Sequence, residues 1–396
     1  MDQALKTNLP ATGLVVPDEH LMGSFIGDES GPTLIVLGSV HGNEAGGVLA
    51  IERILPKLSL LQKKFKGRAY FFAGNTRALQ KGIRFIDSDL NRHWTNANIT
   101  NNLPDSPVSP KLAEDAEQRD LLAEFIRILS TAKSEVYALD LHSTSADGVP
   151  FGTVGDTLRN RAFAQKFPIT FLLGIEEQLD GTILEYLNNL GVVTLGFEAG
   201  QHYAESTIDN DEALIWLALA NSGVVQSSDL PEIEKRRSIL QNSTGKPRII
   251  EIRYRHAISP EDEFSMNPGY ENFQPIKRGE ILARDKNGVI KANESGLILM
   301  PLYQTLGEDG FFIGREISPF WLKVSYLLRR LHLGDFIHIL PGVRKDPGEF
   351  GTFIVNTRVA RFFPLQIFHL LGFRRRRWRK DKLIVSHRRY DTKGPF

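Results

Sequence analysis

Two residues of types that bind metal ions lie three positions apart in this chain. His41 and Glu44 follow an apolar run at 34–37 and a glycine, and an amphipathic segment begins behind them. If the chain starts to coil at this turn, both side chains can converge on one point. An imidazole and a carboxylate supply two of the three protein ligands of a catalytic zinc site, which keeps a fourth position open. Taken alone, such a pair is more often a helix cap or a surface pair.

Two further candidates also end apolar runs. His142 closes the run at 135–141 and offers a third metal ligand, although a lone histidine at a strand end is usually structural. Asp140 would point to the same side as His142 and could hydrogen-bond its imidazole, as carboxylates do for zinc-bound histidines. Capping a turn or bonding a backbone amide are alternative roles for Asp140. Glu198 follows the run at 192–197, where it could also cap a helix.

An α/β domain is predicted to position these residues. Apolar periodicity predicts strands at 33–37, 68–73, 135–142, 169–173 and 192–197, and helices at 45–61, 113–129, 182–189 and 211–220. Strands that alternate with helices indicate a mostly parallel sheet flanked by helices. Because ligands bind at the carboxyl ends of the strands in such sheets, His41, His142 and Glu198 should share one edge.

Changes in composition divide the chain into three regions. We expect an α/β domain over 1–230, with the polar stretch 221–247 as a linker or a poorly packed crossing. Short strands and an Asn287-Gly288 hairpin signal predict a small β-rich domain over 248–317. Residues 318–396 form a basic C-terminal extension, in which 322–340 reads as a packing helix rather than a membrane anchor.

The composition narrows the classes of site. The 396 residues are 41% hydrophobic, carry a net charge of +1 and include no cysteine. Disulfide scaffolds, zinc ribbons and cysteine nucleophiles are therefore excluded, and His, Asp and Glu remain as metal ligands. The first residues lack the pattern of a signal peptide, and no stretch has the length of a membrane span, so we expect a cytoplasmic protein.

Four sequence blocks resemble the succinylglutamate desuccinylase/aspartoacylase family of the zinc carboxypeptidase-like clan. They are His41-Gly42-Asn43-Glu44, Arg84 through Asp89-Leu90-Asn91-Arg92, Asp140-Leu141-His142-Ser143-Thr144 and Phe197-Glu198-Ala199-Gly200-Gln201. The blocks occur in the order and near the spacing of that family. The resemblance covers 31–201 well and the β-rich region loosely, and it ends at about residue 318.

The resemblance implies a zinc-carboxypeptidase-like fold and a zinc-dependent amidohydrolase. It assigns Zn²⁺ to His41, Glu44 and His142, with one position open for water. Glu198 corresponds to the general base that activates this water. The implied reaction is deacylation of a small N-acylated amino acid or a related amide.

The polar segment 76–98 carries the remaining residues of the resemblance. It reads as irregular and is too long for an ordinary connection between packed elements, which favours a functional role. Arg84 corresponds to an arginine that stabilises the oxyanion of the tetrahedral intermediate. Asn91 and Arg92 correspond to residues that bind a substrate carboxylate. By composition alone, arginines in a polar loop are usually solvated.

Two departures from aspartoacylases concern the substrate. The stretch 169–193 contains no arginine for a second substrate carboxylate, and Arg159 and Arg161 come too early. The stretch 310–315 offers phenylalanine where aspartoacylases use a tyrosine. We therefore expect a substrate other than acetylaspartate.

Two alternatives to a deacylase remain open at this point. One is a carboxypeptidase-type metallopeptidase, and the other is a non-catalytic binding protein that uses its basic extension to bind a polyanion. The run Arg374–Lys380 could contact nucleic acid or anionic lipid, but a solvated tail or an intersubunit contact is the more common role of such a run. We therefore expect no nucleic-acid partner, a small-molecule substrate and, as a possibility, a homo-oligomer.

Overall fold

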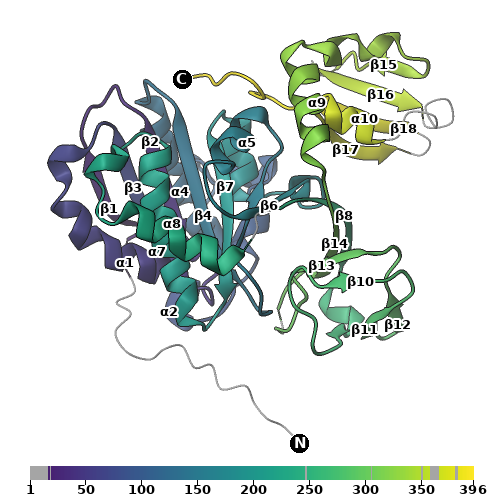
Figure 1. The fold of residues 1–396 in the computed structure, drawn as a ribbon, viewed down its shortest axis with the longest axis horizontal. Coiled ribbons are helices and arrows are strands. Elements are labelled where there is room, and N and C mark those ends of the chain that lie inside the picture. The colour runs from purple at the N-terminus through teal and green to yellow at the C-terminus, as the bar shows by residue number, and fades with distance from the viewer. Residues whose placement is uncertain are drawn as a thin grey trace, which may run out of the picture.

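The computed structural model describes residues 17, 19–245, 248–304, 306–348, 351–356, 365–379 and 382–396, with only the backbone described at 365–366 and 374–379. Figure 1 shows an α/β body from which two smaller β-rich regions extend. This architecture confirms the α/β fold class, with a mostly parallel sheet, flanking helices and a small β-rich region behind them. The boundaries at 230, 248 and 317 remain predictions.

One large sheet forms the centre of the body. Its strand order is β1-β3-β2-β4-β7-β5-β6-β8-β14-β13-β10. These strands are β1 (Leu21–Ile26), β2 (Thr33–Gly38), β3 (Arg68–Ala73), β4 (Val136–Thr144), β5 (Phe151–Val154), β6 (Thr170–Leu173), β7 (Val193–Gln201), β8 (Ile249–Ala257), β10 (Pro275–Ile276), β13 (Gly296–Leu299) and β14 (Asp309–Glu316). The central neighbours β3, β2, β4 and β7 are parallel. Strands β2 and β3 are buried along their whole length because helices cover both faces of the sheet.

Helices cover the two faces of this sheet. The helices of the body are α1 (Gly46–Ser59), α2 (Thr76–Lys81), α3 (Asn96–Asn101), α4 (Ala113–Ser130), α5 (Leu158–Ala164), α6 (Ile183–Asn189), α7 (Glu205–Asn221) and α8 (Ile233–Thr244). Apolar residues of α1, α5, α7 and α8 belong to one core cluster, and those of α4 and α6 to another. Figure 1 shows α1, α7 and α8 stacked on the same side of the sheet.

Two local expectations were wrong. The stretch 221–247, expected to be a linker or a poorly packed crossing, contains the regular helix α8, which buries Leu240 and Thr244. The segment 76–98 contains the short helix α2 and a 3₁₀ turn at Leu90–Arg92 instead of remaining irregular. In both cases only a few side chains face the core. The apolar periodicity that would predict a helix from the sequence is therefore weak.

The β-rich region confirms the hairpin expected at Asn287-Gly288. Strands β11 (Ile281–Asp285) and β12 (Gly288–Lys291) pair antiparallel, with Asp285 opposite Gly288. A third short strand, β9 (Ser265–Met266), completes this sheet. The long pair β8 and β14 connects the region to the large sheet.

The C-terminal extension folds as a unit with its own core. Its sheet has the order β15-β16-β18-β17, and two helices accompany it. The elements are α9 (Pro319–Arg330), β15 (Val343–Lys345), β16 (Thr352–Asn356), α10 (Leu365–Leu370), β17 (Phe373–Arg379) and β18 (Lys382–His387). β17 carries most of the Arg374–Lys380 run, whose side chains lie outside the described residues. Among the described residues, no helix is long and apolar enough to cross a membrane.

Buried ion pairs join this unit to the α/β body. Arg329 of α9 lies 2.9 Å from Asp156 and 3.2 Å from Asp391, with 1% of its side chain exposed. Arg388 lies 2.5 Å from Glu176 and 2.8 Å from Glu177. Buried charges of this kind fix the relative position of the parts that they join, since an unpaired buried charge is costly.

We predict that Arg329→Ala lowers the free energy of unfolding by about 3–5 kcal/mol, because Asp156 loses one of its buried partners. Arg330→Ala is the matched control on the same helix. The Arg330 side chain is exposed and stacks on Tyr326, so its loss should cost no more than about 1 kcal/mol. Urea unfolding of the full chain measures both values. Equal losses in the two variants would contradict a role for the buried pairs.

Candidate metal centre

A tight turn after β2 carries the first two candidate ligands. Ser39 has a positive φ of 57°, and its hydroxyl donates a hydrogen bond to the backbone carbonyl of Glu44 at 2.9 Å. A Cβ atom on Gly42 would lie 2.1 Å from the backbone carbon of Ala78 in α2. Only glycine permits this close approach, so the turn delivers His41 and Glu44 to the carboxyl end of β2.

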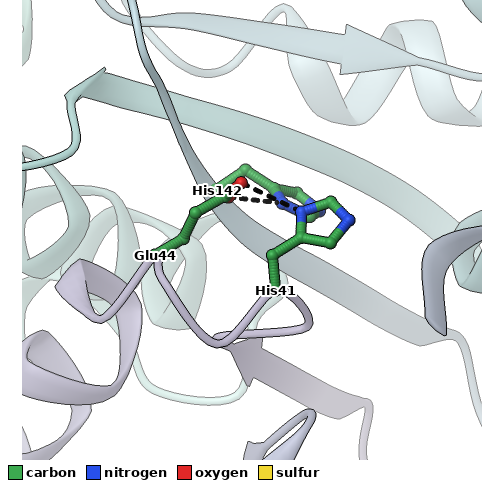
Figure 2. A group of neighbouring side chains, drawn as sticks. All are labelled: His41, Glu44 and His142. Atoms are coloured by element: carbon green, nitrogen blue, oxygen red, sulfur yellow. Dashed lines mark hydrogen bonds and ion pairs between the residues drawn. The ribbon is translucent and has the colours of Figure 1, made fainter. Parts of the chain in front are cut away.

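Glu44 joins the two histidines through its two carboxylate oxygens. Its Oε1 lies 3.0 Å from His41 Nδ1, and its Oε2 lies 2.9 Å from His142 Nδ1. Figure 2 shows the three side chains converging from the turn after β2 and from β4. One ligand atom from each residue lies within 4.8 Å of the others. The structure therefore brings together the three residues that the sequence analysis proposed as metal ligands.

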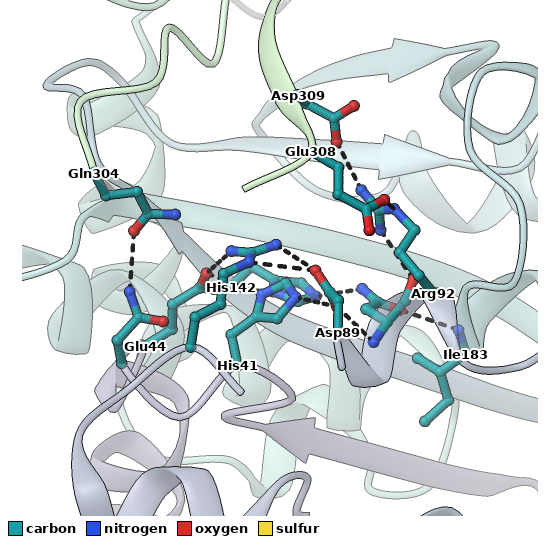
Figure 3. Close-up of polar contacts among 12 residues, drawn as sticks. His41, Glu44, Asp89, Arg92, His142, Ile183, Gln304, Glu308 and Asp309 are labelled. Atoms are coloured by element: carbon teal, nitrogen blue, oxygen red, sulfur yellow. Dashed lines mark hydrogen bonds and ion pairs between the residues drawn. The ribbon is translucent and has the colours of Figure 1, made fainter. Parts of the chain in front are cut away.

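An aspartate holds each imidazole from the opposite side. The Nε2 atom of His142 lies 2.8 Å from Asp140 Oδ2. The Nε2 atom of His41 lies 3.0 Å from Asp89 Oδ1, and Figure 3 shows this second contact. Donation of each Nε2 proton to an aspartate leaves both Nδ1 lone pairs free for a cation. The sequence analysis proposed Asp140 for this position but gave Asp89 no role. The only signal for Asp89 was its place within the second sequence block.

Arg84 lies between the two acidic groups. Its guanidinium donates to Asp89 Oδ2 at 2.9 Å and to Glu44 Oε1 at 3.3 Å. Burial opposes its charge, but the adjacent Asp89 and Glu44 carboxylates outweigh this effect and raise the pKa of Arg84. Arg84 therefore places a permanent positive charge beside the candidate centre.

Glu198 is a buried carboxyl group on the neighbouring strand. In the parallel pair β4 and β7, Glu198 lies opposite His142. Its Oε2 atom is buried without a hydrogen-bond partner among the described residues. Burial, together with the negative charges of Glu44 and Asp140, raises the pKa of Glu198 to about 8. This side chain can therefore both accept and release a proton near neutral pH.

Asn91 and Arg92 have contacts within the protein. The Asn91 amide nitrogen lies 3.2 Å from His142 Nε2, and its carbonyl oxygen accepts a hydrogen bond from the Ile183 amide at 3.0 Å. Arg92 lies 2.7 Å from Asp309 and 3.6 Å from Glu308, as Figure 3 shows. Both residues line the cavity over the candidate centre.

This cavity has a volume of about 1190 Å³ and includes all the proposed site residues in its wall. The C-terminal unit contributes His387, Arg388 and Arg389 to the same wall, although the sequence analysis gave the extension no part in the site. Phe312 lines the cavity from β14, and no tyrosine is found among the described lining residues.

The two early arginines are not part of the described wall of the cavity. Arg159 pairs with Glu135 and donates to the Gly191 carbonyl at 2.8 Å, and Arg161 pairs with Asp156. Both guanidinium groups thus have structural partners, which supports the expectation that neither replaces the missing substrate arginine.

Comparison with known proteins identifies the domain. Residues 30–220 match the profile of the succinylglutamate desuccinylase/aspartoacylase catalytic domain. A probable aspartoacylase from Prochlorococcus marinus (strain MIT 9515) is 26% identical over 287 residues, which cover 70% of this chain and 89% of that protein.

Solved structures share the fold. A succinylglutamate desuccinylase/aspartoacylase from Rhodobacter sphaeroides aligns with a TM-score of 0.53 and 19% identity over 75% of this chain and 88% of its own. A succinylglutamate desuccinylase from Vibrio parahaemolyticus aligns with a TM-score of 0.52 and 15% identity over 76% and 94%. Residues 30–220 of this chain therefore form a succinylglutamate desuccinylase/aspartoacylase catalytic domain.

Proposed function

We propose that this protein is a zinc-dependent hydrolase that cleaves the amide bond of a small N-acylated amino acid or a related amide. The observation that carries the proposal is the convergence of His41, Glu44 and His142 beside the buried carboxyl group of Glu198. The names of its relatives, which are aspartoacylases and succinylglutamate desuccinylases, support a deacylase.

The donor set fits zinc. Two imidazole nitrogens and one carboxylate are a known set of ligands for catalytic zinc, and the cysteine-free chain offers no competing thiolate. Asp89 and Asp140 contact the Nε2 atoms of the two imidazoles, which leaves the Nδ1 atoms toward the centre, and zinc-bound histidines typically have such a carboxylate on the other ring nitrogen. A bound zinc ion would lower the pKa of water to about 7 and polarise the substrate carbonyl group.

Glu198 moves the proton in this proposal. It accepts a proton from the attacking water and gives it to the nitrogen of the leaving amine when the amide bond breaks. Its position supports both steps, because its Oε2 atom is buried without a hydrogen-bond partner among the described residues and it lies opposite His142. A purely structural metal site would have no use for such a group.

Arg84 stabilises the negative charge that develops on the carbonyl oxygen. Its guanidinium is held in place by Asp89 and Glu44, so little rearrangement is needed during the reaction. Asn91 and Arg92 bind the substrate carboxylate. The Arg92 guanidinium keeps Asp309 and Glu308 as partners in the free protein, and the substrate would have to share or displace them.

A carboxypeptidase-type metallopeptidase is the second candidate. The cavity volume of about 1190 Å³ lies above the usual range of about 300–1,000 Å³ for small-molecule sites, which favours a longer substrate. The β-rich region and the C-terminal unit both supply residues to its wall, and this enclosure favours small amides over an extended peptide.

We predict that Glu198→Gln lowers kcat by about 10²–10⁴-fold while zinc remains bound, because the amide cannot take up the proton. Asp180→Asn is the control, since Asp180 is an exposed carboxylate of the same cavity wall. Initial rates and metal content are measured on the same preparations. Full activity of Glu198→Gln would show that Glu198 is not the general base.

We predict that Asp89→Asn weakens zinc binding by about 10–100-fold, because His41 loses the acceptor that fixes its tautomer. Competition with a chromophoric chelator measures the dissociation constant, with Asp180→Asn again as the control. An unchanged affinity would show that Asp89 does not orient the ligand.

We predict that a panel of N-acetyl, N-formyl and N-succinyl amino acids yields free amine, with acetylaspartate at least about tenfold below the best substrate in kcat/KM. The reason is that residues 169–193 contain no arginine that could pair with a second carboxylate of the substrate. Amine release is the readout. Turnover confined to peptides with a free C-terminus would instead support the metallopeptidase.

A further inference from the structure

The C-terminal unit exposes a group of large apolar side chains that no part of the proposed hydrolase uses. We call this group the apolar patch; it lies on α9 and on the 3₁₀ helix Leu333–Ile339 that follows. Its members are Phe320, Trp321, Tyr326, Leu327, Leu331, Leu333, Phe336 and Ile339. Their exposed fractions run from 41% for Leu333 to 71% for Ile339. Large exposed apolar side chains gathered on two successive elements, as here, are typical of a contact with a partner or a membrane.

Helix α9 has two distinct faces. Ser325 and Arg329 are buried and fasten the helix to the rest of the protein. On the opposite side, Phe320, Leu327 and Leu331 recur at helical spacing and face solvent. The expectation of one packing helix over 322–340 is wrong in its extent, because α9 ends at Arg330 and a separate 3₁₀ helix follows at Leu333–Ile339.

Exposed basic side chains lie in the same stretch of the chain as the apolar patch. Lys323, Arg330, Arg344 and Lys345 are all exposed. Asp335 is the only acidic residue between positions 318 and 345. Lys323 and Arg330 belong to the exposed side of α9, and Arg330 stacks on the Tyr326 ring at 5.9 Å. The surface thus combines aromatic and aliphatic side chains with a clear excess of cations.

We propose that the apolar patch docks on the surface of a membrane that contains anionic lipids. Tryptophan, tyrosine and phenylalanine are favoured at the boundary between lipid headgroups and acyl chains. Exposed lysines and arginines are attracted to anionic headgroups. An amphipathic helix with this composition binds in the plane of the interface and does not cross the bilayer.

A second copy of this chain fits the same surface less well. A symmetric dimer formed through the patch would bring the Lys323 and Arg330 side chains of the two copies close together, and juxtaposed like charges oppose association. Lysine is also depleted in protein–protein interfaces. Charge complementarity therefore favours an anionic lipid surface as the occupant.

The apolar patch and the candidate active site share no described residues. The described lining of the cavity includes no member of the apolar patch. Membrane binding and hydrolysis can therefore be tested separately, and failure of one does not decide the other.

The test is co-sedimentation of the full-length protein with large vesicles. We expect binding to vesicles of equal parts phosphatidylcholine and phosphatidylglycerol, at least about tenfold weaker binding to pure phosphatidylcholine, and a loss of affinity as salt is added. The double variant Leu327→Glu with Leu331→Glu should bind the anionic vesicles at least about tenfold more weakly. Leu60→Glu, at an 87% exposed position of the α/β body, is the matched control and should bind as the unaltered protein does.

Three results would overturn the proposal. One is the absence of vesicle binding by the unaltered protein, and another is equal binding by the double variant once thermal unfolding has shown that it is folded. The third is a dimer in analytical ultracentrifugation that the double variant converts to a monomer, which would assign the apolar patch to a second copy of the chain.

Discussion

The shared carboxylate of Glu44 is the interaction on which the proposed site depends. Each of its oxygens contacts one imidazole, so the turn after β2 and the end of β4 must be held in a fixed relation. The parallel register of β2 and β4, in which Gly38 lies opposite Leu141, supplies that relation. Asp89 and Asp140 then fix the far side of each ring, and the buried acidic charge is balanced by Arg84. A buried cluster of charges is tolerable only with this degree of pairing.

The sequence was sufficient to predict the central sheet and the convergence of the candidate ligands. Strands β2, β4 and β7 each contain an apolar run, and each run is followed by a polar residue that can bind a metal ion or transfer a proton. Because the carboxyl ends of parallel strands share an edge, His41, His142 and Glu198 could be placed together without any knowledge of long-range contacts. The resemblance of four short blocks to a known family added roles to residues that periodicity alone could only locate.

Other features depend on contacts that a linear pattern does not reveal. Asp89 is a partner of His41 only in the folded chain, where its loop brings Asp89 Oδ1 within 3.0 Å of His41 Nε2. Helix α8 was missed because Leu240 and Thr244 are its only buried residues, which gives too weak a periodicity. The C-terminal unit places Arg388 against Glu176 and Glu177, which lie far earlier in the chain. No local sequence pattern predicts such ion pairs.

The central claim is that His41, Glu44 and His142 bind one ion together and leave a position open. X-ray absorption spectroscopy at the zinc edge of the zinc-loaded protein tests it most directly. We predict two imidazole nitrogens at about 2.0–2.1 Å from the zinc ion and a carboxylate oxygen at about 2.0–2.2 Å from it. We also predict one further light-atom ligand that exchanges with added inhibitor or solvent. A spectrum without histidine scattering, or one with a closed set of four protein ligands, would contradict it.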